Sequence, residues 1–277
     1  MPARVEPTGK SCGVIESGRR SVFRPHTVTF DCWSTLVQEG RRRPSVPTRA
    51  QIVAHATGAV EERAVAALRL AWREHQVAWH RRQIFTAADI TGETLRILEA
   101  SLDPEPLREL IDALESHALN YDLYTADGAA AALETLADAG VRRALVCDTG
   151  CTSGRIVRTI LDRAGLLGWF EVTVFSDEIG VPKPHPLAFR TALERLGVSA
   201  EGAVHVGDVR RSDIAGARGC GMGSIRLTVF HDDGDRSAAG NPNLIDCADA
   251  GCDPVCERPE ADAVVSSFAS VMAQLGY

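Results

Sequence analysis

The chain has 277 residues, of which 45% are hydrophobic and 24% are charged, and this balance is typical of a globular protein with a substantial core. Its formal net charge of −7 argues against a general nucleic-acid or membrane-surface partner, because both of those surfaces are negative themselves. No apolar stretch approaches the length of a bilayer-spanning helix, so we expect no membrane partner.

The chain opens with residues 1–25, which we interpret as a polar tail because they lack the continuous apolar segment of a secretory signal. Residues 26–31 follow as a predicted strand in which Val28 and Phe30 point to the same side. Together with the residues up to 40, this strand forms the first part of a predicted α/β core.

The region between Val37 and Tyr124 has helical periodicity and no strand pattern. Helical segments are predicted over residues 60–83, 87–102 and 104–119. We therefore predict an all-helical cap domain over residues 41–122, inserted after the first strand and lying over the edge of the sheet. A domain in this place would exclude water and contact a substrate.

Strands and helices alternate in the rest of the chain, residues 123–277. The predicted strands are 141–147, 170–176, 203–207 and 223–229, and the predicted helices are 127–140, 153–165, 185–197, 212–221 and 261–276. This alternation predicts an α/β fold with a doubly wound parallel sheet, covered by helices on both faces and built from residues 26–40 and 123–277.

One long irregular segment interrupts this alternation. Residues 230–260 are rich in Asp, Gly, Pro and Asn and predict a loop within the core. Cys247, Cys252 and Cys256 could bind zinc there, with His231 or an Asp as the fourth ligand. Their spacing matches no standard pair of zinc-binding turns, so a loop that orders on a partner or substrate is the alternative.

Three further cysteines fall inside or beside predicted core elements. Cys32, Cys147 and Cys220 occupy positions where free cysteine usually behaves as a small buried hydrophobe. A chain of this length does not need disulfides to fold, so we expect a reducing, cytoplasmic location.

Four short segments each place a reactive polar residue at the end of an apolar run. They supply Asp31, the step from Cys147 through Asp148 to Thr149, Lys183, and Asp208 with Asp213. In an open parallel sheet, ligands bind at the carboxyl ends of the strands, so these segments would converge on one pocket. Carboxylates, a lysine and a small hydroxyl or thiol in one pocket suit a magnesium-assisted attack by aspartate.

In this order the four segments resemble the motifs of the haloacid dehalogenase superfamily, whose members have a Rossmann-like core and an inserted cap. The resemblance covers roughly residues 26–229 and the last helix. It implies that Asp31 attacks phosphorus or an alkyl carbon, forming a covalent intermediate that water then releases. It also implies that Thr35 holds the loop after the nucleophile by a hydrogen bond to the backbone.

The chain departs from the phosphatase branch of this family at Trp33. That branch carries a second Asp there, which protonates the leaving group. Indole is no general acid or base, so a contribution of ~10²–10⁴-fold in rate is missing or comes from elsewhere. An aromatic residue here resembles the dehalogenase branch instead. Trp33 can still offer its backbone carbonyl to a metal and its ring to a substrate.

The second and third segments supply the predicted substrate-binding residues and a catalytic lysine. The family has Ser or Thr where this chain has Cys147, and a thiol is the weaker hydrogen-bond donor. Either Thr149 and nearby backbone amides then take over, with Asp148 between them, or phosphate binding is weakened. A buried structural cysteine is an equal alternative. Lys183 matches the family lysine that neutralises the nucleophile and the transferring anion.

The fourth segment carries the predicted metal ligands. The resemblance implies that Asp208 and Asp213 bind Mg²⁺ together with Asp31 and the backbone carbonyl of Trp33, since hard oxygen donors suit magnesium rather than zinc. The dehalogenase branch works without metal, so this motif and Trp33 favour different reactions. Asp213 could instead be an acidic residue at a helix N-terminus.

The predicted cap contains a basic and aromatic cluster. Its members are Trp72, Arg73, His75, Trp79, His80, Arg81 and Arg82. Helical spacing places Trp72, His75 and Trp79 on one face. An arginine that binds an anionic substrate competes here with a solvated face around packed tryptophans.

We therefore predict a Mg²⁺-dependent phosphatase that acts on a small anionic, phosphorylated metabolite through an aspartyl phosphate on Asp31. Without the usual acid, it would prefer leaving groups that need little protonation, or would recruit His75 or His80. The alternatives are a dehalogenase that uses Asp31 to attack carbon, and a catalytically weakened scaffold that binds a ligand or protein. A homodimer is an open alternative for its assembly.

Overall fold

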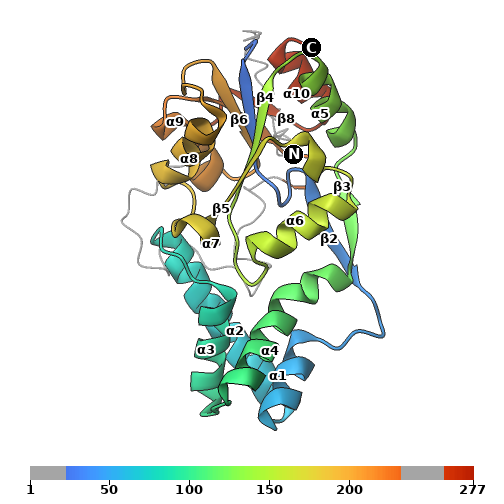
Figure 1. Ribbon diagram of the computed structural model, residues 1–277, viewed down its shortest axis with the longest axis vertical. Helices are drawn as coiled ribbons and strands as arrows, with labels where there is room; N and C mark the ends of the chain where they lie inside the picture. Colours follow the sequence, from blue (N-terminus) through green and yellow to red (C-terminus); the bar gives the residue numbers. More distant parts are fainter. Residues whose placement is uncertain (1–22, 232–258) are drawn as a thin grey trace, which may run out of the picture.

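The protein is described from a computed structural model that covers residues 23–231 and 259–277. Its elements form an α/β core and a smaller lobe of helices at one end of the core (Figure 1). The predicted tail and the three loop cysteines, Cys247, Cys252 and Cys256, lie outside the described residues.

The core is a parallel sheet of six strands in the order β5-β4-β1-β6-β7-β8. The strands are β1 (Thr27–Phe30), β4 (Arg142–Cys147), β5 (Val172–Phe175), β6 (Ala203–Gly207), β7 (Gly223–Leu227) and β8 (Ala263–Val265). The strand order reverses at β1: β4 and β5 lie on one side of it, and β6, β7 and β8 lie on the other. The carboxyl ends of β1, β4 and β6 therefore meet at the point where a doubly wound sheet binds its ligands. The predicted fold class is confirmed.

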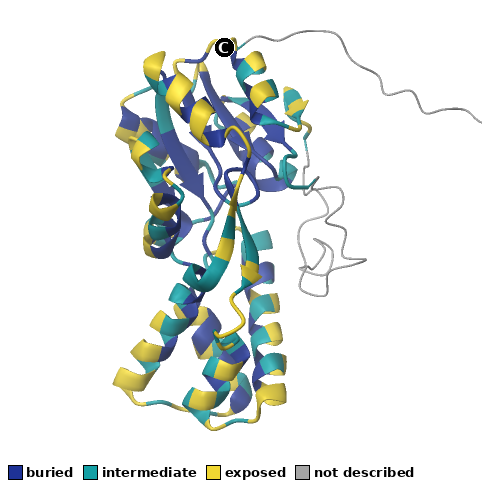
Figure 2. Cartoon of the chain, turned by 90° about the vertical axis from the view of Figure 1, so that its right-hand side faces the viewer, coloured by how far each residue is buried: buried dark blue, intermediate teal, exposed yellow. Residues whose placement is uncertain are grey.

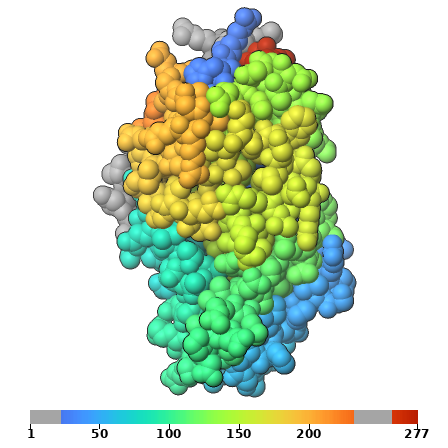
Figure 3. Space-filling view, viewed as in Figure 1, coloured from blue at the N-terminus to red at the C-terminus, as the bar shows by residue number. Residues whose placement is uncertain are grey.

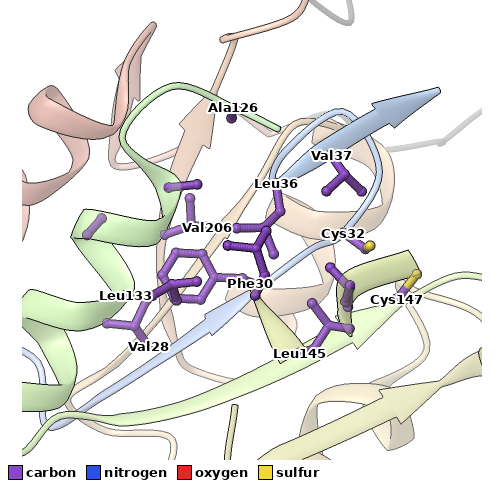
Figure 4. Packing of buried hydrophobic residues seen from close by; sticks show 14 of the residues in the cluster. Val28, Phe30, Cys32, Leu36, Val37, Ala126, Leu133, Leu145, Cys147 and Val206 are labelled. Atoms are coloured by element: carbon purple, nitrogen blue, oxygen red, sulfur yellow. The ribbon is translucent and has the colours of Figure 1, made fainter. Parts of the chain in front are cut away.

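Helices cover both faces of this sheet. They are α5 (Ala129–Asp138), α6 (Gly154–Arg163), α7 (Ser176–Ile179), α8 (Pro186–Leu196), α9 (Ala215–Gly219) and α10 (Phe268–Leu275), with short helical turns at η1 (His117–Asn120), η2 (Leu167–Trp169) and η3 (Arg210–Ile214). Val28 and Phe30 of β1 point into one apolar cluster with residues of α5, α6 and α10 (Figure 4). A second cluster packs α8 and α9 against β4 and β5. Burial on both faces explains why the strands are nearly continuous apolar runs.

The helical lobe consists of four helices with a core of their own. They are α1 (Arg49–Thr57), α2 (Glu61–His80), α3 (Ala87–Leu98) and α4 (Pro104–Ser116). Reciprocal capping boxes start α1 at Thr48 and α3 at Thr86, and Pro104 occupies the first turn of α4. Each helix turns a buried stripe inward and an exposed stripe outward (Figure 2). This cap lobe therefore folds around its own hydrophobic contacts.

Two strands join the cap lobe to the core, and the sequence did not predict them. β2 (Val37–Arg42) pairs antiparallel with β3 (Tyr121–Thr125). The expectation of no strand between Val37 and Tyr124 is therefore wrong. Most of β2 is polar and only half-buried, so its strand conformation depends on a partner about eighty residues away rather than on a local pattern.

The last predicted helix is also shorter than expected. Residues 261–276 contain the edge strand β8 followed by α10, rather than one continuous helix. The β-branched residues Val264 and Val265 extend the sheet beside β7, and Ser267 then caps α10 by accepting a hydrogen bond from the Ser270 backbone amide. None of the helices within residues 23–231 and 259–277 combines the length and apolar character needed to cross a bilayer.

Candidate active site

Asp31 is the first residue after β1 and points into a cavity between the two lobes. Its backbone amide donates to the carbonyl of Val206 at 2.9 Å, which ties this residue to the end of β6. The chain then turns tightly, and the Thr35 hydroxyl donates to Asp31 Oδ2 at 3.3 Å. The bond of Thr35 to the carboxylate itself, rather than to the backbone, differs from the sequence-based expectation.

Lys183 joins the carboxylates of two different segments. Its Nζ atom lies 2.6 Å from Asp31 Oδ1 and 2.6 Å from Asp213 Oδ1, and its side chain is 2% exposed. A buried ammonium group is stable only when paired, and two carboxylates satisfy that requirement here. The structure thus brings together three of the residues predicted from three separate motifs.

Asp213 is held firmly by its surroundings. The backbone amide of Val209 donates to its Oδ2 atom at 2.9 Å, and the carboxylate fills the space where Gly207 has no side chain. A Cβ atom on Gly207 would lie 2.5 Å from Asp213 Cγ. The glycine at the end of β6 is therefore what lets this carboxylate approach the sheet.

His205, which is not among the predicted site residues, also contacts Asp213. Its Nε2 atom lies 3.3 Å from Asp213 Oδ1, and its Nδ1 atom lies 2.8 Å from the hydroxyl of Thr29, its register partner on β1. The carboxylate only accepts, so Nε2 carries the proton and Nδ1 accepts from Thr29. Burial lowers the pKa of His205, which favours this neutral form. The sequence offers one clue to His205: it and Thr29 are polar residues at matched positions of two buried strands.

Burial and neighbouring charges shift the pKa values of Asp31 and Asp213 in opposite directions. Burial raises the pKa of Asp31 to about 8; Lys183 opposes the shift, and Asp213 and Asp208 add to it. Although burial opposes it, the pKa of Asp213 is lowered, because Lys183 and His205 both stabilise its charged form. Asp213 is therefore a fixed anion, whereas Asp31 is charged only at a free-energy cost that another cation would reduce.

The carboxylates of Asp31, Asp208 and Asp213 together fit a divalent cation. Asp31, Asp208 and Asp213 are all buried, and one oxygen atom of each lies within 4.8 Å of the others. Asp208 is 2% exposed, and its Oδ2 atom lies 3.2 Å from His231 Nε2. His231, considered above as a zinc ligand, thus lies at this cluster. Hard oxygen donors in this number suit Mg²⁺.

Two of the predicted substrate-binding residues do not present their polar groups to the cavity. Cys147 is 1% exposed and belongs to the apolar cluster beside Cys32 (Figure 4). Thr149 lines the cavity, but its hydroxyl contacts Ser176 and donates to Asp177, each at 3.0 Å. Both residues were predicted to bind substrate, but their polar groups contact other parts of the protein.

Asp148 connects the cap lobe to the segment that carries Lys183. Its Oδ2 atom accepts a hydrogen bond from Trp79 Nε1 of α2 at 2.8 Å, and its Oδ1 atom accepts one from the Lys183 backbone amide at 2.8 Å. The guanidinium of Arg211 stacks over the Trp79 ring at 3.7 Å. These contacts hold the two lobes together around the site, and the lobes touch along one face of the molecule (Figure 3).

The cavity is open to solvent on one side, has a volume of about 740 Å³ and is lined from both lobes. The core contributes Asp31, Trp33, Lys183, Asp208 and Asp213. From the cap, Trp72, His75 and Trp79 line it on one helix face, as predicted, whereas Arg73, His80, Arg81 and Arg82 do not. A cavity of this size takes a small metabolite.

His75 is held in one orientation within this wall. Its Nδ1 atom lies 2.9 Å from the carbonyl of Phe85, which can only accept, so Nδ1 carries the proton in the neutral ring. Burial lowers the His75 pKa and favours that neutral form. The Nε2 atom faces Gly150, where an added Cβ would lie 2.9 Å away. His75 is thus a cavity residue with an available acceptor nitrogen.

Comparison with known proteins identifies a family over most of the chain. Residues 25–221 match the model of a haloacid dehalogenase-like hydrolase. A 78-residue segment is 46% identical to a glyceraldehyde 3-phosphate phosphatase of Methanopyrus kandleri, covering 27% of this chain and 34% of that protein. A 129-residue segment is 36% identical to a phosphoserine phosphatase of Thermus thermophilus, covering 46% of this chain and 49% of that protein.

The solved structures extend the likeness to the whole fold. The crystal structure of a phosphatase of this type from Thermococcus onnurineus aligns with 90% of this chain and 97% of its own, with a TM-score of 0.59 at 22% identity. At that identity the likeness shows the fold alone. The curated relatives named above are matched over only a third to a half of their length.

Proposed function

The chain belongs to the haloacid dehalogenase-like hydrolase family, and from this premise we propose that it is a magnesium-dependent phosphatase of small phosphorylated metabolites. The observation that carries the proposal is the cluster of three buried carboxylates, two of which pair with one buried lysine, near the ends of β1 and β6. Relatives named as phosphatases of glyceraldehyde 3-phosphate and phosphoserine support the choice of phosphate esters.

In this proposal Asp31 is the nucleophile. Its carboxylate attacks the phosphorus atom, the ester oxygen leaves, and water then hydrolyses the aspartyl phosphate. Lys183 favours the charged form of Asp31 against the effect of burial and offsets charge on the transferring group, while Thr35 fixes the orientation of the carboxylate. Asp213, fixed by Val209 and His205, keeps Lys183 in place.

Asp31, Asp208, Asp213 and the Trp33 carbonyl would hold the metal. Bound there, Mg²⁺ supplies positive charge for the phosphoryl oxygens. The carboxylates then have two cations, the metal and Lys183, instead of one. This pairing would relieve the repulsion that raises the Asp31 pKa.

With Trp33 in place of the usual acid, the departing ester oxygen has no proton donor at this position, because indole is no general acid. His75 is the cap residue best placed to assist, since it lines the cavity and His80 does not. Its neutral form accepts rather than donates, which favours a role in accepting a proton from the hydrolytic water. Leaving groups that need little protonation, such as acyl or aryl phosphates, should then react faster than alkyl phosphates.

A screen of phosphate and haloacid substrates tests the proposal. We expect phosphate release that requires Mg²⁺ and stops with a chelator, and no halide release from 2-haloacids. Halide release without metal would establish the dehalogenase that Trp33 favours. Ligand-induced stabilisation without turnover of any substrate would establish a binding scaffold instead.

Replacing Asp208 with Asn should weaken metal binding selectively. The change keeps the shape of the side chain but removes one negative charge from the cluster, so we expect the Mg²⁺ concentration for half-maximal activity to rise at least about 10–100-fold. Titration of phosphate release with Mg²⁺ measures this shift. The matched control is Asp162→Asn on the exposed side of α6, and an unchanged Mg²⁺ dependence in Asp208→Asn would contradict the metal assignment.

A further inference from the structure

The cap side of the cavity contains two polar side chains whose hydrogen-bonding groups are not fully used. Arg49, the first residue of α1, lines the cavity, and its Nε atom is buried with no hydrogen-bond partner among the described residues. Gln76 of α2 is 6% exposed and lines the same cavity, and no hydrogen bond joins its amide to the rest of the described chain. A buried donor without a partner costs free energy, so such a group indicates a ligand.

Arg49 and His75, the residue before Gln76, approach one short segment of the core. The Arg49 side chain lies near the Cys151 thiol, whose pKa is raised by burial and lowered in part by the Arg49 charge, and His75, the neighbour of Gln76 in sequence, packs against Gly150. Gly150 and Cys151 themselves line the cavity. Arg49 and Gln76 therefore line the same cavity as Asp31, and both come from helices of the cap lobe.

The charge around Arg49 leaves it able to bind an anion. Within residues 23–231 and 259–277, no carboxylate lies within 4.0 Å of its guanidinium nitrogens. Glu39 shares the cavity, and burial raises the pKa of its carboxyl group, with Arg49 opposing the shift. The shift makes the Glu39 carboxyl group easier to protonate than an exposed glutamate, which lessens its opposition to an incoming anion.

We propose that Arg49 and Gln76 form a subsite for a carboxylate carried by the substrate, so that the enzyme selects phosphate esters of carboxylic acids. The inference rests on the proposed phosphatase function. A guanidinium N–H and an amide NH₂ are both donors, and the two oxygens of a carboxylate accept from both. With the phosphoryl group at Asp31 and Lys183, the carboxylate would occupy the cap side of the cavity of about 740 Å³.

Matched pairs of esters that differ by one carboxylate test this subsite. Suitable pairs are O-phosphoserine with O-phosphoethanolamine, and 2-phosphoglycolate with 2-hydroxyethyl phosphate. We expect the wild-type enzyme to prefer the carboxylate-bearing member of each pair, and Arg49→Met to reduce that preference at least about tenfold, mainly through KM. Arg49→Lys should keep part of the preference, because lysine keeps the charge but loses the planar donor edge.

Arg73→Met is the matched control, since Arg73 is an exposed cap arginine that does not line the cavity. It should leave the preference unchanged, and thermal melting of each variant confirms folding. An equal loss for both members of a pair in Arg49→Met, or no wild-type preference, would overturn the subsite.

Binding separates failure of the subsite from failure of the proposed function. If the wild-type protein hydrolyses no ester, calorimetric titration with the same pairs still measures the subsite. Selective binding of the carboxylate-bearing esters that is lost in Arg49→Met would support the subsite while the phosphatase proposal fails. Equal binding of both members of each pair, or no binding, would overturn the subsite.

Discussion

Replacing Asp31 with Asn is expected to reduce phosphate release at least about 10⁴-fold, because an amide of the same shape cannot act as the nucleophile. The variant should nevertheless fold. The Asp31 pKa is raised by burial to about 8 in the folded protein, so the fold favours the protonated carboxyl group. This contribution to stability is present at low pH and is lost as the pH rises from the ordinary carboxyl range towards 8.

A neutral Asn should therefore leave the melting temperature at neutral pH, measured in a chelator, unchanged or higher. Steady-state kinetics and thermal melting of the same preparation measure the two effects. Asp162→Asn, which changes an exposed carboxylate on α6, is the control for the loss of one charge. Turnover above about one tenth of the wild-type rate in Asp31→Asn would remove Asp31 from the mechanism.

Replacing Lys183 with Met is expected to have the largest effect on stability. Lys183 is 2% exposed and lies 2.6 Å from both Asp31 and Asp213, so its loss leaves the Asp213 anion buried without its cation and removes the hydrogen-bond donor of Asp31. Breaking a buried pair in this way typically costs about 3–5 kcal/mol of unfolding free energy. Activity should fall as well, because the transferring anion loses the ammonium group.

Urea denaturation with and without Mg²⁺ measures this effect. Arg142→Met is the matched control, because its ion pair with Glu171 is exposed on both sides and should contribute less than about 1 kcal/mol. A magnesium ion would replace part of the missing charge, so added Mg²⁺ should stabilise Lys183→Met more than it stabilises the wild type. A loss of less than about 1 kcal/mol for Lys183→Met would contradict the paired arrangement.

The sequence predicted the parts of this structure that depend on local patterns. Val28 and Phe30 alternate with threonines in β1, and the later strands and helices follow the expected periods, so the order of the core elements was accessible. Asp31, Lys183 and Asp213 could be assigned to one pocket because parallel strands end at one edge of the sheet. The rarity of lysine also draws attention to Lys183. The chain has 30 lysines and arginines together, and Lys10 and Lys183 are its two lysines.

The missed features all depend on contacts between distant segments. β2 and β3 are polar strands that pair with each other, although all the cap helices lie between them in the sequence. Neither strand has a strong local pattern. The hydrogen bond from Trp79 to Asp148 joins two lobes whose relative position the sequence does not encode locally. The orientation of the Thr149 hydroxyl towards Ser176 and Asp177 likewise required the packed structure.

Detection of phosphate on the protein tests the central claim most directly. The enzyme is mixed with a ³²P-labelled ester and Mg²⁺, quenched in acid within one turnover, and separated from free substrate. We predict label on the wild-type chain, located on the peptide that contains Asp31 and released by hydroxylamine, with none on Asp31→Asn. Turnover of the ester without any protein-bound label, or equal labelling of Asp31→Asn, would contradict nucleophilic attack by this aspartate.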